Sequence, residues 1–267
     1  MKPLLFTVVW CLACTPLFAF GLTGNLSPDA MALGGNNLSS PDFYHSNPSL
    51  SNSDSIAFGC FAANQYGVKE LFTYQANCFF LTKYGKFGLI TKHYGYDVFN
   101  ESNLGFSYQY FIHNRFSLNS ELQLYLLQTG VTYAAAPILN IGFSAQPWNR
   151  LTLAFQVRNI SFSTIHANGN RYALPVIFEL GAHYKFNRQL WAITAFEKDL
   201  YAPFRFNAGL QYTVHGFDIR IGVNVLKRMS PAFGFGYHSE HWRFDIGFLY
   251  DLYLGLQSSV GIRYCLR

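Results

Sequence analysis

Residues 204–226 read FRFNAGLQYTVHGFDIRIGVNVL, and this stretch decides the fold. Apolar and polar residues alternate strictly through Phe204–Val214 and again through Phe217–Leu226, with His215 and Gly216 between the two runs. Alternation with a period of two predicts β-strands, and a two-residue link predicts a hairpin. One face of this hairpin is aromatic or aliphatic, and the other is polar, charged or glycine. Roughly ten residues per strand is also the length that a tilted strand needs to cross a bilayer.

The N-terminus has the order of a secretory signal peptide. Lys2 precedes an apolar run that ends near position 20, and the small residues Ala19 and Gly21 close it. This order predicts a signal peptide over residues 1–21, cleaved after Ala19 or Gly21. A membrane anchor is the alternative, but the run is short and contains a proline; a lipoprotein site at Cys14 fits less well. Beyond residue 22 no apolar run approaches the roughly 18 residues of a membrane helix.

The composition favours a protein that meets lipid with its outer surface. Charged residues make up 12% of the chain and aromatic residues 18%, with 50% hydrophobic residues overall. Soluble domains carry roughly 25% charged residues, so a soluble fold would keep little polar surface here. The net charge of +5 is mild and calls for no nucleic acid partner. We therefore predict an all-β protein, a transmembrane antiparallel β-barrel in the bacterial outer membrane.

The rest of the chain repeats the strand unit. Over residues 55–267 the alternation predicts fourteen strands of the barrel. Their expected ranges are 55–63, 71–82, 86–95, 104–113, 116–126, 138–146, 151–158, 176–186, 190–197, 204–214, 217–226, 230–238, 242–250 and 255–264. An even number of antiparallel strands is the plan of bacterial outer-membrane barrels.

The connections give a second pattern. Those after even-numbered strands are tight, and those after odd-numbered strands are mostly longer, notably residues 96–103, 127–137 and 159–175. Short periplasmic turns and longer outer loops predict both termini on the periplasmic side. Aromatic residues near strand ends would form interfacial girdles, although each could equally be an ordinary strand residue. The girdle candidates are Tyr84, Tyr94, Trp148, Trp191, Tyr201 and Trp242.

Residues 22–54 differ from the strands and predict a small segment tucked into the barrel as a plug. They are rich in Asn, Ser, Pro and Gly. Ser27 suits a helix N-cap, Pro28 suits the first helical position, and Gly34-Gly35 suits a helix end. A turn is expected at Asn47-Pro48. We take Gly34, Gly35, Asn47 and Pro48 as structural plug residues.

The polar faces of the strands place charges in the barrel lumen. Two interpretations are open: opposite charges that neutralise one another and hold a plug, or a basic lining that attracts an anionic ligand. The lumen charges are Lys92, Glu121, Arg158, Glu179, Lys185, Arg205, Asp218, Arg220, Arg243, Asp245 and Arg263.

No motif predicts an enzyme, a cofactor or a metal site. The eight histidines are scattered, and the chain has neither a nucleophile elbow nor a Walker loop. A His and a Ser on adjacent strands could still form a membrane hydrolase, which is the weaker alternative. Cys60 and Cys78 flank a candidate hairpin and could pair, but small apolar strand residues are the preferred interpretation. No Cys/His spacing suggests zinc.

Several short motifs resemble the FadL-like outer-membrane barrels, and most of all the PorV and PorQ group of Bacteroidetes. They are Ala30-Met-Ala-Leu-Gly-Gly35, Asn47-Pro-Ser-Leu50, Asn159-Ile160, Leu174-Pro175 and Leu254-Gly255 before the last strand. The resemblance implies fourteen strands, no catalysis, and an accessory role in type IX secretion, in which cargo is accepted or anchored at the cell surface. Implied partners are membrane lipid and secretion-machinery or cargo proteins. The alternatives are FadL-like uptake of hydrophobic small molecules through a plugged lumen, and a structural barrel.

Overall fold

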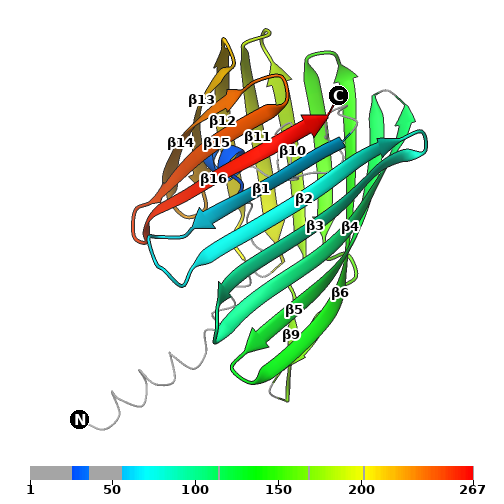
Figure 1. Cartoon of the computed structure of the whole chain (residues 1–267), viewed down its shortest axis with the longest axis vertical. Coiled ribbons are helices and arrows are strands. Elements are labelled where there is room, and N and C mark those ends of the chain that lie inside the picture. The colour runs from blue at the N-terminus through cyan, green and yellow to red at the C-terminus, as the bar shows by residue number, and fades with distance from the viewer. Residues whose placement is uncertain (1–25, 36–55, 114, 168, 201, 267) are drawn as a thin grey trace.

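The computed structural model describes residues 26–35, 56–113, 115–167, 169–200 and 202–266. In this part of the chain, fourteen strands form one closed antiparallel barrel (Figure 1). The predicted fold class and strand number are confirmed. The barrel strands are β1 (Ile56–Asn64), β2 (Phe72–Thr82), β3 (Gly85–Tyr96), β4 (Phe99–His113), β5 (Phe116–Thr129), β6 (Thr132–Trp148), β7 (Leu151–Arg158), β10 (Ile177–Lys185), β11 (Leu190–Asp199), β12 (Arg205–Val214), β13 (Phe217–Val225), β14 (Met229–His238), β15 (Trp242–Asp251) and β16 (Gly255–Leu266).

Neighbouring barrel strands follow one another in the chain, and β1 pairs with β16 to close the barrel. The end at which β1 begins and β16 finishes also carries the tight connections 83–84, 149–150, 186–189 and 215–216. We call it the turn end, and the opposite end the loop end. Closure leaves no free sheet edge around the wall, which a barrel in lipid requires.

The hairpin of β12 and β13 forms as its sequence predicts. Val214 lies opposite Phe217, and Phe206 lies opposite Val225. Both turn residues have positive φ, 48° at His215 and 84° at Gly216. That conformation is the two-residue turn whose twist matches paired antiparallel strands.

Replacing Gly216 by alanine will destabilise the barrel by about 1–2 kcal/mol, because a residue with a side chain resists positive φ. A new Cβ would also lie 2.8 Å from the His238 carbonyl oxygen. Urea unfolding of the micelle-embedded protein measures the change. Gly105→Ala, at a glycine whose φ is not in the positive region, is the control. Equal free energies of unfolding for the two variants would contradict the turn assignment.

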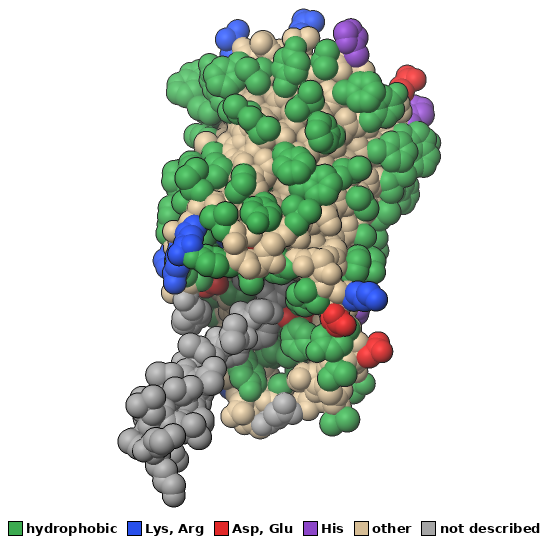
Figure 2. Space-filling view, turned by 90° about the vertical axis from the view of Figure 1, so that its left-hand side faces the viewer, with side chains coloured by type: hydrophobic (Ala, Val, Ile, Leu, Met, Phe, Trp, Pro, Cys, Tyr) green, Lys and Arg blue, Asp and Glu red, His purple; other side chains and the backbone are tan. Residues whose placement is uncertain are grey.

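The outer wall is apolar. In Figure 2 hydrophobic side chains cover much of the visible wall, while most charged side chains lie toward its ends. On β13 the side chains of Phe217, Ile219 and Ile221 are 56%, 46% and 56% exposed. Continuous apolar surface of this extent is stable in contact with lipid and unstable in contact with water. Within the described residues, no helix is both long enough and apolar enough to cross a membrane.

Two connections predicted to be long are instead tight turns. Strand β4 already begins at Phe99, β5 runs to Thr129 and β6 starts at Thr132, so that only two residues link each pair. The predicted loops 96–103 and 127–137 are therefore wrong. Residues 100–103 are polar on both faces and 134–136 are all alanine, so this part of the hairpins shows no alternation. The predicted alternation of short turns at one end of the barrel and longer loops at the other is therefore not found at these two connections.

Residues 159–176 remain a long connection, and they contain a hairpin of β8 (Thr164–Ala167) and β9 (Asn170–Ala173). Ile165 of this hairpin packs with Tyr125, Leu127 and Ile138 of β5 and β6 in a buried apolar cluster. The loop end of the wall therefore has an apolar patch covered by the chain itself.

The predicted aromatic girdle is correct only in part. Tyr84, Trp148 and Trp242 are exposed at 67%, 67% and 46%. Trp191 is 8% exposed and faces the lumen, and Tyr94 lies opposite the buried Glu101. Tyr201 lies outside the described residues.

The two cysteines of the first hairpin are free thiols. Cys60 lies opposite Ala76, and Cys78 lies opposite Phe58. The two cysteines are therefore one diagonal step apart rather than facing each other. The preferred interpretation, small apolar strand residues, agrees with this arrangement.

Candidate functional site in the barrel lumen

A short helix lies inside the barrel. Helix α2 (Pro28–Ala32) is completely buried and lies behind β15 and β16 in Figure 1. The predicted helix is confirmed, with Pro28 in its first turn. Ser27 occupies the N-cap position, but its side chain makes no cap hydrogen bond, contrary to the prediction. Gly34 and Gly35 have φ values of 83° and 79° and follow the helix, as expected. Asn47 and Pro48 lie outside the described residues.

Four glycines of the wall form a cradle for this helix. They stand on the adjacent strands β12 to β15, and each faces the lumen. Gly209 lies opposite Gly222, and Gly234 lies opposite Gly247. A methyl group at Gly222 would lie 2.5 Å from the Gly34 nitrogen, and one at Gly247 would overlap the Pro28 carbonyl. Only glycine lets the helix backbone approach the wall this closely. We call these four residues the glycine cradle.

Apolar side chains hold the helix against the wall on both sides of the cradle. Met31 packs with Phe61 of β1 and Leu249 of β15. Leu33 packs with Trp191 and Ile193 of β11. The inward faces are therefore more apolar around the helix than the polar and glycine-rich pattern predicts.

One polar contact fixes the end of the helix. Asn224 on β13 donates a hydrogen bond to the Gly34 carbonyl at 3.1 Å. A backbone carbonyl at a helix end has no partner within the helix, so this bond satisfies an otherwise unpaired group. Apolar packing, the glycine cradle and this bond together position the helix.

Beside the helix lies a buried cluster of four charges, Asp218, Arg220, Arg243 and Asp245. Arg220 contacts Asp218 at 3.0 Å and Asp245 at 2.7 Å. Arg243 contacts Asp245 at 2.8 Å and also pairs with Asp218. Gly236 on β14 stands between them, opposite both aspartates. Two cations and two anions neutralise each other, which favours the structural interpretation of these charges.

The helix brings a fifth charged group to this cluster. Burial, reinforced by the nearby Asp245 carboxylate, raises the pKa of Asp29 from 3.8 to about 6. A raised pKa in the docked state means that protonated Asp29 favours docking. This stabilisation is fully present below pH 3.8 and is lost as the pH rises through about 6.

Asp29→Asn should therefore remove a pH dependence. We expect the wild-type unfolding midpoint to fall between pH 5 and pH 7.5 by more than that of the asparagine variant, because asparagine stays neutral. Urea unfolding at both pH values measures this. Asp97→Asn, in an exposed loop-end turn, is the control. An equal pH dependence in wild type and Asp29→Asn would show that this carboxyl does not titrate in the range.

The remaining predicted lumen charges are spread along the wall. Arg158 pairs with Glu179 at 2.8 Å, and Arg205 pairs with Glu197 at 3.0 Å. Glu121 accepts hydrogen bonds from Gln123 and Asn140. Lys92 neighbours Glu101, Arg263 lies opposite Arg243, and Lys185 stands in the mouth at the turn end.

Sequence reasoning misses two inward carboxylates, Glu101 and Glu197. Residues 96–103 read as a loop, so Glu101 has no predicted face. Glu197 ends a predicted strand, yet it lies opposite both Glu179 and Arg205. Glu197 lies on the same face of the strand as Trp191, so the expectation that Trp191 faces lipid hides this inward carboxylate. Among the described residues, no group of three or more His, Cys, Asp or Glu side chains is placed to hold a metal ion.

Comparison with known proteins identifies the architecture. No protein-family model and no curated protein sequence matches this chain. The CymD monoaromatic hydrocarbon channel superposes with a TM-score of 0.65 at 12% identity, over 93% of this chain and 99% of that one. The Ralstonia pickettii toluene transporter TbuX gives 0.67 at 12% identity, over 93% and 100%. A Pseudomonas aeruginosa FadL homologue gives 0.67 at 10% identity, over 90% and 98%.

Likeness at this identity concerns the fold. A closed barrel with an apolar outer wall is the form in which single chains cross the bacterial outer membrane. The chain has the fold of these solved structures, a closed fourteen-stranded antiparallel β-barrel of the kind that crosses the bacterial outer membrane.

Proposed function

We propose that this protein is a channel for hydrophobic small molecules across the outer membrane. The observation that carries the proposal is a lumen helix held by apolar contacts, Met31 against Phe61 and Leu33 against Trp191. In the channel that we propose, a helix seated this way closes the lumen to water and ions. The apolar surfaces that it covers are those a hydrophobic molecule would contact if the helix moved.

The solved structures of similar fold support this choice. Two of them are described as a monoaromatic hydrocarbon channel and a toluene transporter.

Uptake of labelled toluene by whole cells tests the proposal. The protein is expressed in a Gram-negative host that lacks hydrocarbon channels, and cells with the empty vector are the control. We expect faster toluene entry with the protein and unchanged entry of a sugar of similar size. Equal toluene entry with and without the protein would contradict the proposal.

The type IX secretion role remains a prediction that rests on the sequence resemblance to the PorV and PorQ group. No comparison supports it, and partners in a secretion machinery follow only from that resemblance. Deletion in the native host, followed by proteomics of the cell surface, tests it. Loss of surface proteins would favour secretion, whereas an unchanged surface together with slower toluene entry favours the channel.

A further inference from the structure

Strand β6 has a free edge at the loop end of the barrel. Closure removes free edges at the level where all fourteen strands overlap, but β6 continues beyond that level. It pairs with β5 from Thr132 to Ala145, whereas β7 joins it only from Ile141 onward. Among the described strands, residues 132–140 therefore have a ladder partner on one side only. In Figure 1 the hairpin of β5 and β6 extends well below β14, β15 and β16.

The chain itself covers the part of this edge next to β7. Backbone groups of successive strand residues point to alternate sides of the strand. The Leu139 carbonyl accepts from the Ile160 N–H at 2.8 Å, and the Leu139 N–H donates to Ser161 Oγ at 3.1 Å. The Pro137 carbonyl accepts from the Ser163 hydroxyl. The backbone groups of Leu139 and Pro137 therefore face the edge and have partners there.

The same alternation leaves the next two edge residues open. Ala135 and Tyr133 stand two and four positions before Pro137, so their backbone groups point to the same side of β6. No described residue hydrogen-bonds to them on that side. Their two N–H groups and two carbonyl groups are available to a further strand.

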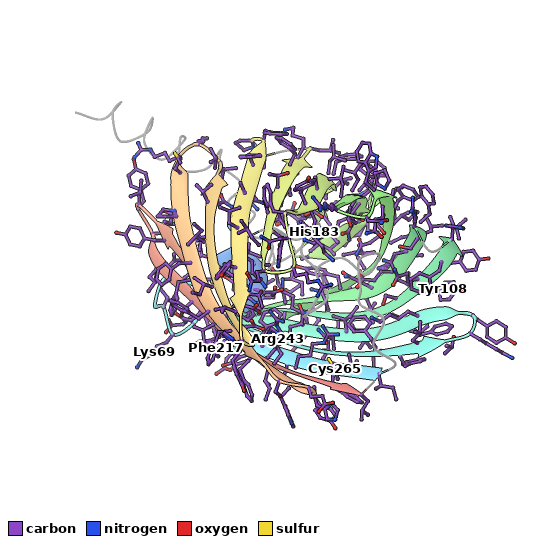
Figure 3. All side chains as sticks on the ribbon, turned by 90° about the horizontal axis from the view of Figure 1, so that it is seen from above. Lys69, Tyr108, His183, Phe217, Arg243 and Cys265 are labelled. Carbon is purple, nitrogen blue, oxygen red and sulfur yellow. The ribbon has the colours of Figure 1, made fainter. Side chains whose placement is uncertain are left out.

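The outer face of this edge is uncovered. Figure 3 shows Tyr108 of β4 pointing away from the barrel. Tyr108 lies opposite Ser120 of β5, which lies opposite Ile141 of β6. These residues share the outer face, and because side chains alternate along a strand, the other odd-numbered residues of β6 share it too. The Tyr133 side chain is accordingly 74% exposed.

Nothing in the sequence of the edge protects it. Residues 132–136 read Thr-Tyr-Ala-Ala-Ala, without a charge or a proline, the residues with which sheets protect free edges. Val131 at the tip is 94% exposed. The Gly130 N–H donates to the Val98 carbonyl at 2.7 Å, which brings a second exposed valine beside it. An apolar edge of this kind is a template for another strand.

The edge lies outside the bilayer. About nine to eleven tilted residues are enough to cross a membrane. Strand β7 has 8 residues and β13 has 9, whereas β6 has 17. The first residues of β6 therefore project from the membrane surface, and with the tight turns on the periplasmic side they face the cell exterior. A polypeptide in water can reach them, and lipid chains cannot.

A second copy of this chain in the same membrane does not fit the edge. Strand β6 would run from the loop end toward the bilayer in both copies. Barrel strands are tilted by about 35–45°, so a two-fold axis along the membrane normal would cross the two strands at about 70–90°. Neighbouring strands of one sheet differ in direction by only about 20–25°. The edge therefore fits a free extended segment better than a second barrel.

We propose that the free edge of β6 binds an extended polypeptide segment of another protein outside the cell, which adds a strand to the wall. The segment pairs with the backbone groups of Tyr133 and Ala135. Its outward side chains lie beside Tyr133, and its inward side chains lie beside the small residues Ala134 and Ala136. Backbone pairing supplies affinity, and the alternate side chains supply selectivity. This site is independent of the proposed channel, because it lies outside the lumen.

Binding of a synthetic peptide to the purified full-length protein in micelles tests the inference. The peptide copies residues 122–129 of β5, the partner of β6 on its other side, with glutamates at both ends for solubility. Fluorescence anisotropy of a label on the peptide should show saturable binding. Ala135→Pro removes one edge N–H and blocks the edge with its ring, so it should weaken binding at least about tenfold. Ala135→Ser keeps the N–H and, as the matched control, should bind like wild type.

The proline variant should still fold. Pro137 already occupies an equivalent position on the same edge, where the missing N–H does not belong to the ladder with β5. Migration of unheated samples on gels checks this. Toluene uptake by cells that carry Ala135→Pro should equal that of wild type, so that the peptide site and the channel fail separately.

Two N-methylated forms of the peptide test the pairing without any change in the protein. One form carries N-methyl groups on its even-numbered residues, and the other carries them on its odd-numbered residues. The N–H groups of a strand point alternately to its two sides, so only one form can offer free N–H groups to the edge. We expect that form to bind like the parent peptide and the other to bind at least about tenfold more weakly.

Four results would each overturn the inference. They are absent peptide binding, equal binding by wild type and Ala135→Pro, equal binding of the two N-methylated forms, and a dimer in micelles that Ala135→Pro abolishes. The last result would show that a second copy covers the edge.

Discussion

Replacing Arg220 by glutamine will lower the free energy of unfolding by about 3–5 kcal/mol, the range measured when one partner of a buried charge cluster is removed. Arg220 is fully buried, and it contacts Asp218, Asp245 and the Gln211 side-chain oxygen. Without its positive charge, Arg243 alone faces two buried carboxylates. Urea unfolding in micelles, followed by tryptophan fluorescence, measures the loss.

Two further variants make this result specific. Arg171→Gln removes an exposed arginine from β9 and should change the stability by less than about 1 kcal/mol. Arg220→Gln/Asp245→Asn restores charge balance and should recover part of the loss. A loss below about 1 kcal/mol for Arg220→Gln would show that the cluster is solvated and does not hold the wall together.

Replacing Gly222 by valine will displace the lumen helix and open the barrel. Even a single methyl group at this position lies 2.5 Å from the Gly34 nitrogen and from the Leu33 carbonyl carbon, and the backbone there cannot rotate away. Overpacking of this kind costs about 1–3 kcal/mol, which is comparable to the contacts of so short a helix. We expect cells that carry the variant to become several-fold more sensitive to vancomycin, which is too large for a closed barrel.

Gly105→Val is the matched control for this variant. Gly105 also faces the lumen, but a new side chain there meets the flexible ends of Glu121 and Gln123 instead of the helix backbone. Its sensitivity to vancomycin should stay near that of wild type. Equal sensitivity of cells with Gly222→Val and with wild type, at equal amounts of folded protein, would mean that the glycine cradle does not seat the helix.

The sequence predicts the barrel and the two faces of its strands, but it does not predict how the side chains inside the barrel are arranged. The alternation in residues 204–226 predicts both strands and their two faces, because lipid on one side and a lumen on the other enforce a period of two. The same rule fails at residues 100–103, which are polar on both faces. The position of Trp191 near a strand end predicts an aromatic residue at the membrane interface. Its side chain instead points into the lumen and packs against Leu33.

The candidate site depends on distances between strands far apart in sequence, which periodicity does not supply. Gly222 and Gly247 both fall on predicted polar faces, but only the fold shows that they stand under one helix. The same holds for Asp218 and Asp245, which lie on strands separated by β14. Single inward charges were predictable, whereas their pairing was not.

Transport of toluene by the purified protein tests the channel most directly. The protein is reconstituted in an asymmetric membrane with a lipopolysaccharide outer leaflet, which hinders hydrophobic solutes, and toluene transfer and ion conductance are recorded together. We expect faster toluene transfer than through the membrane alone, with ion conductance close to background. Unchanged toluene transfer, or steady ion conductance like that of an open porin, would contradict it.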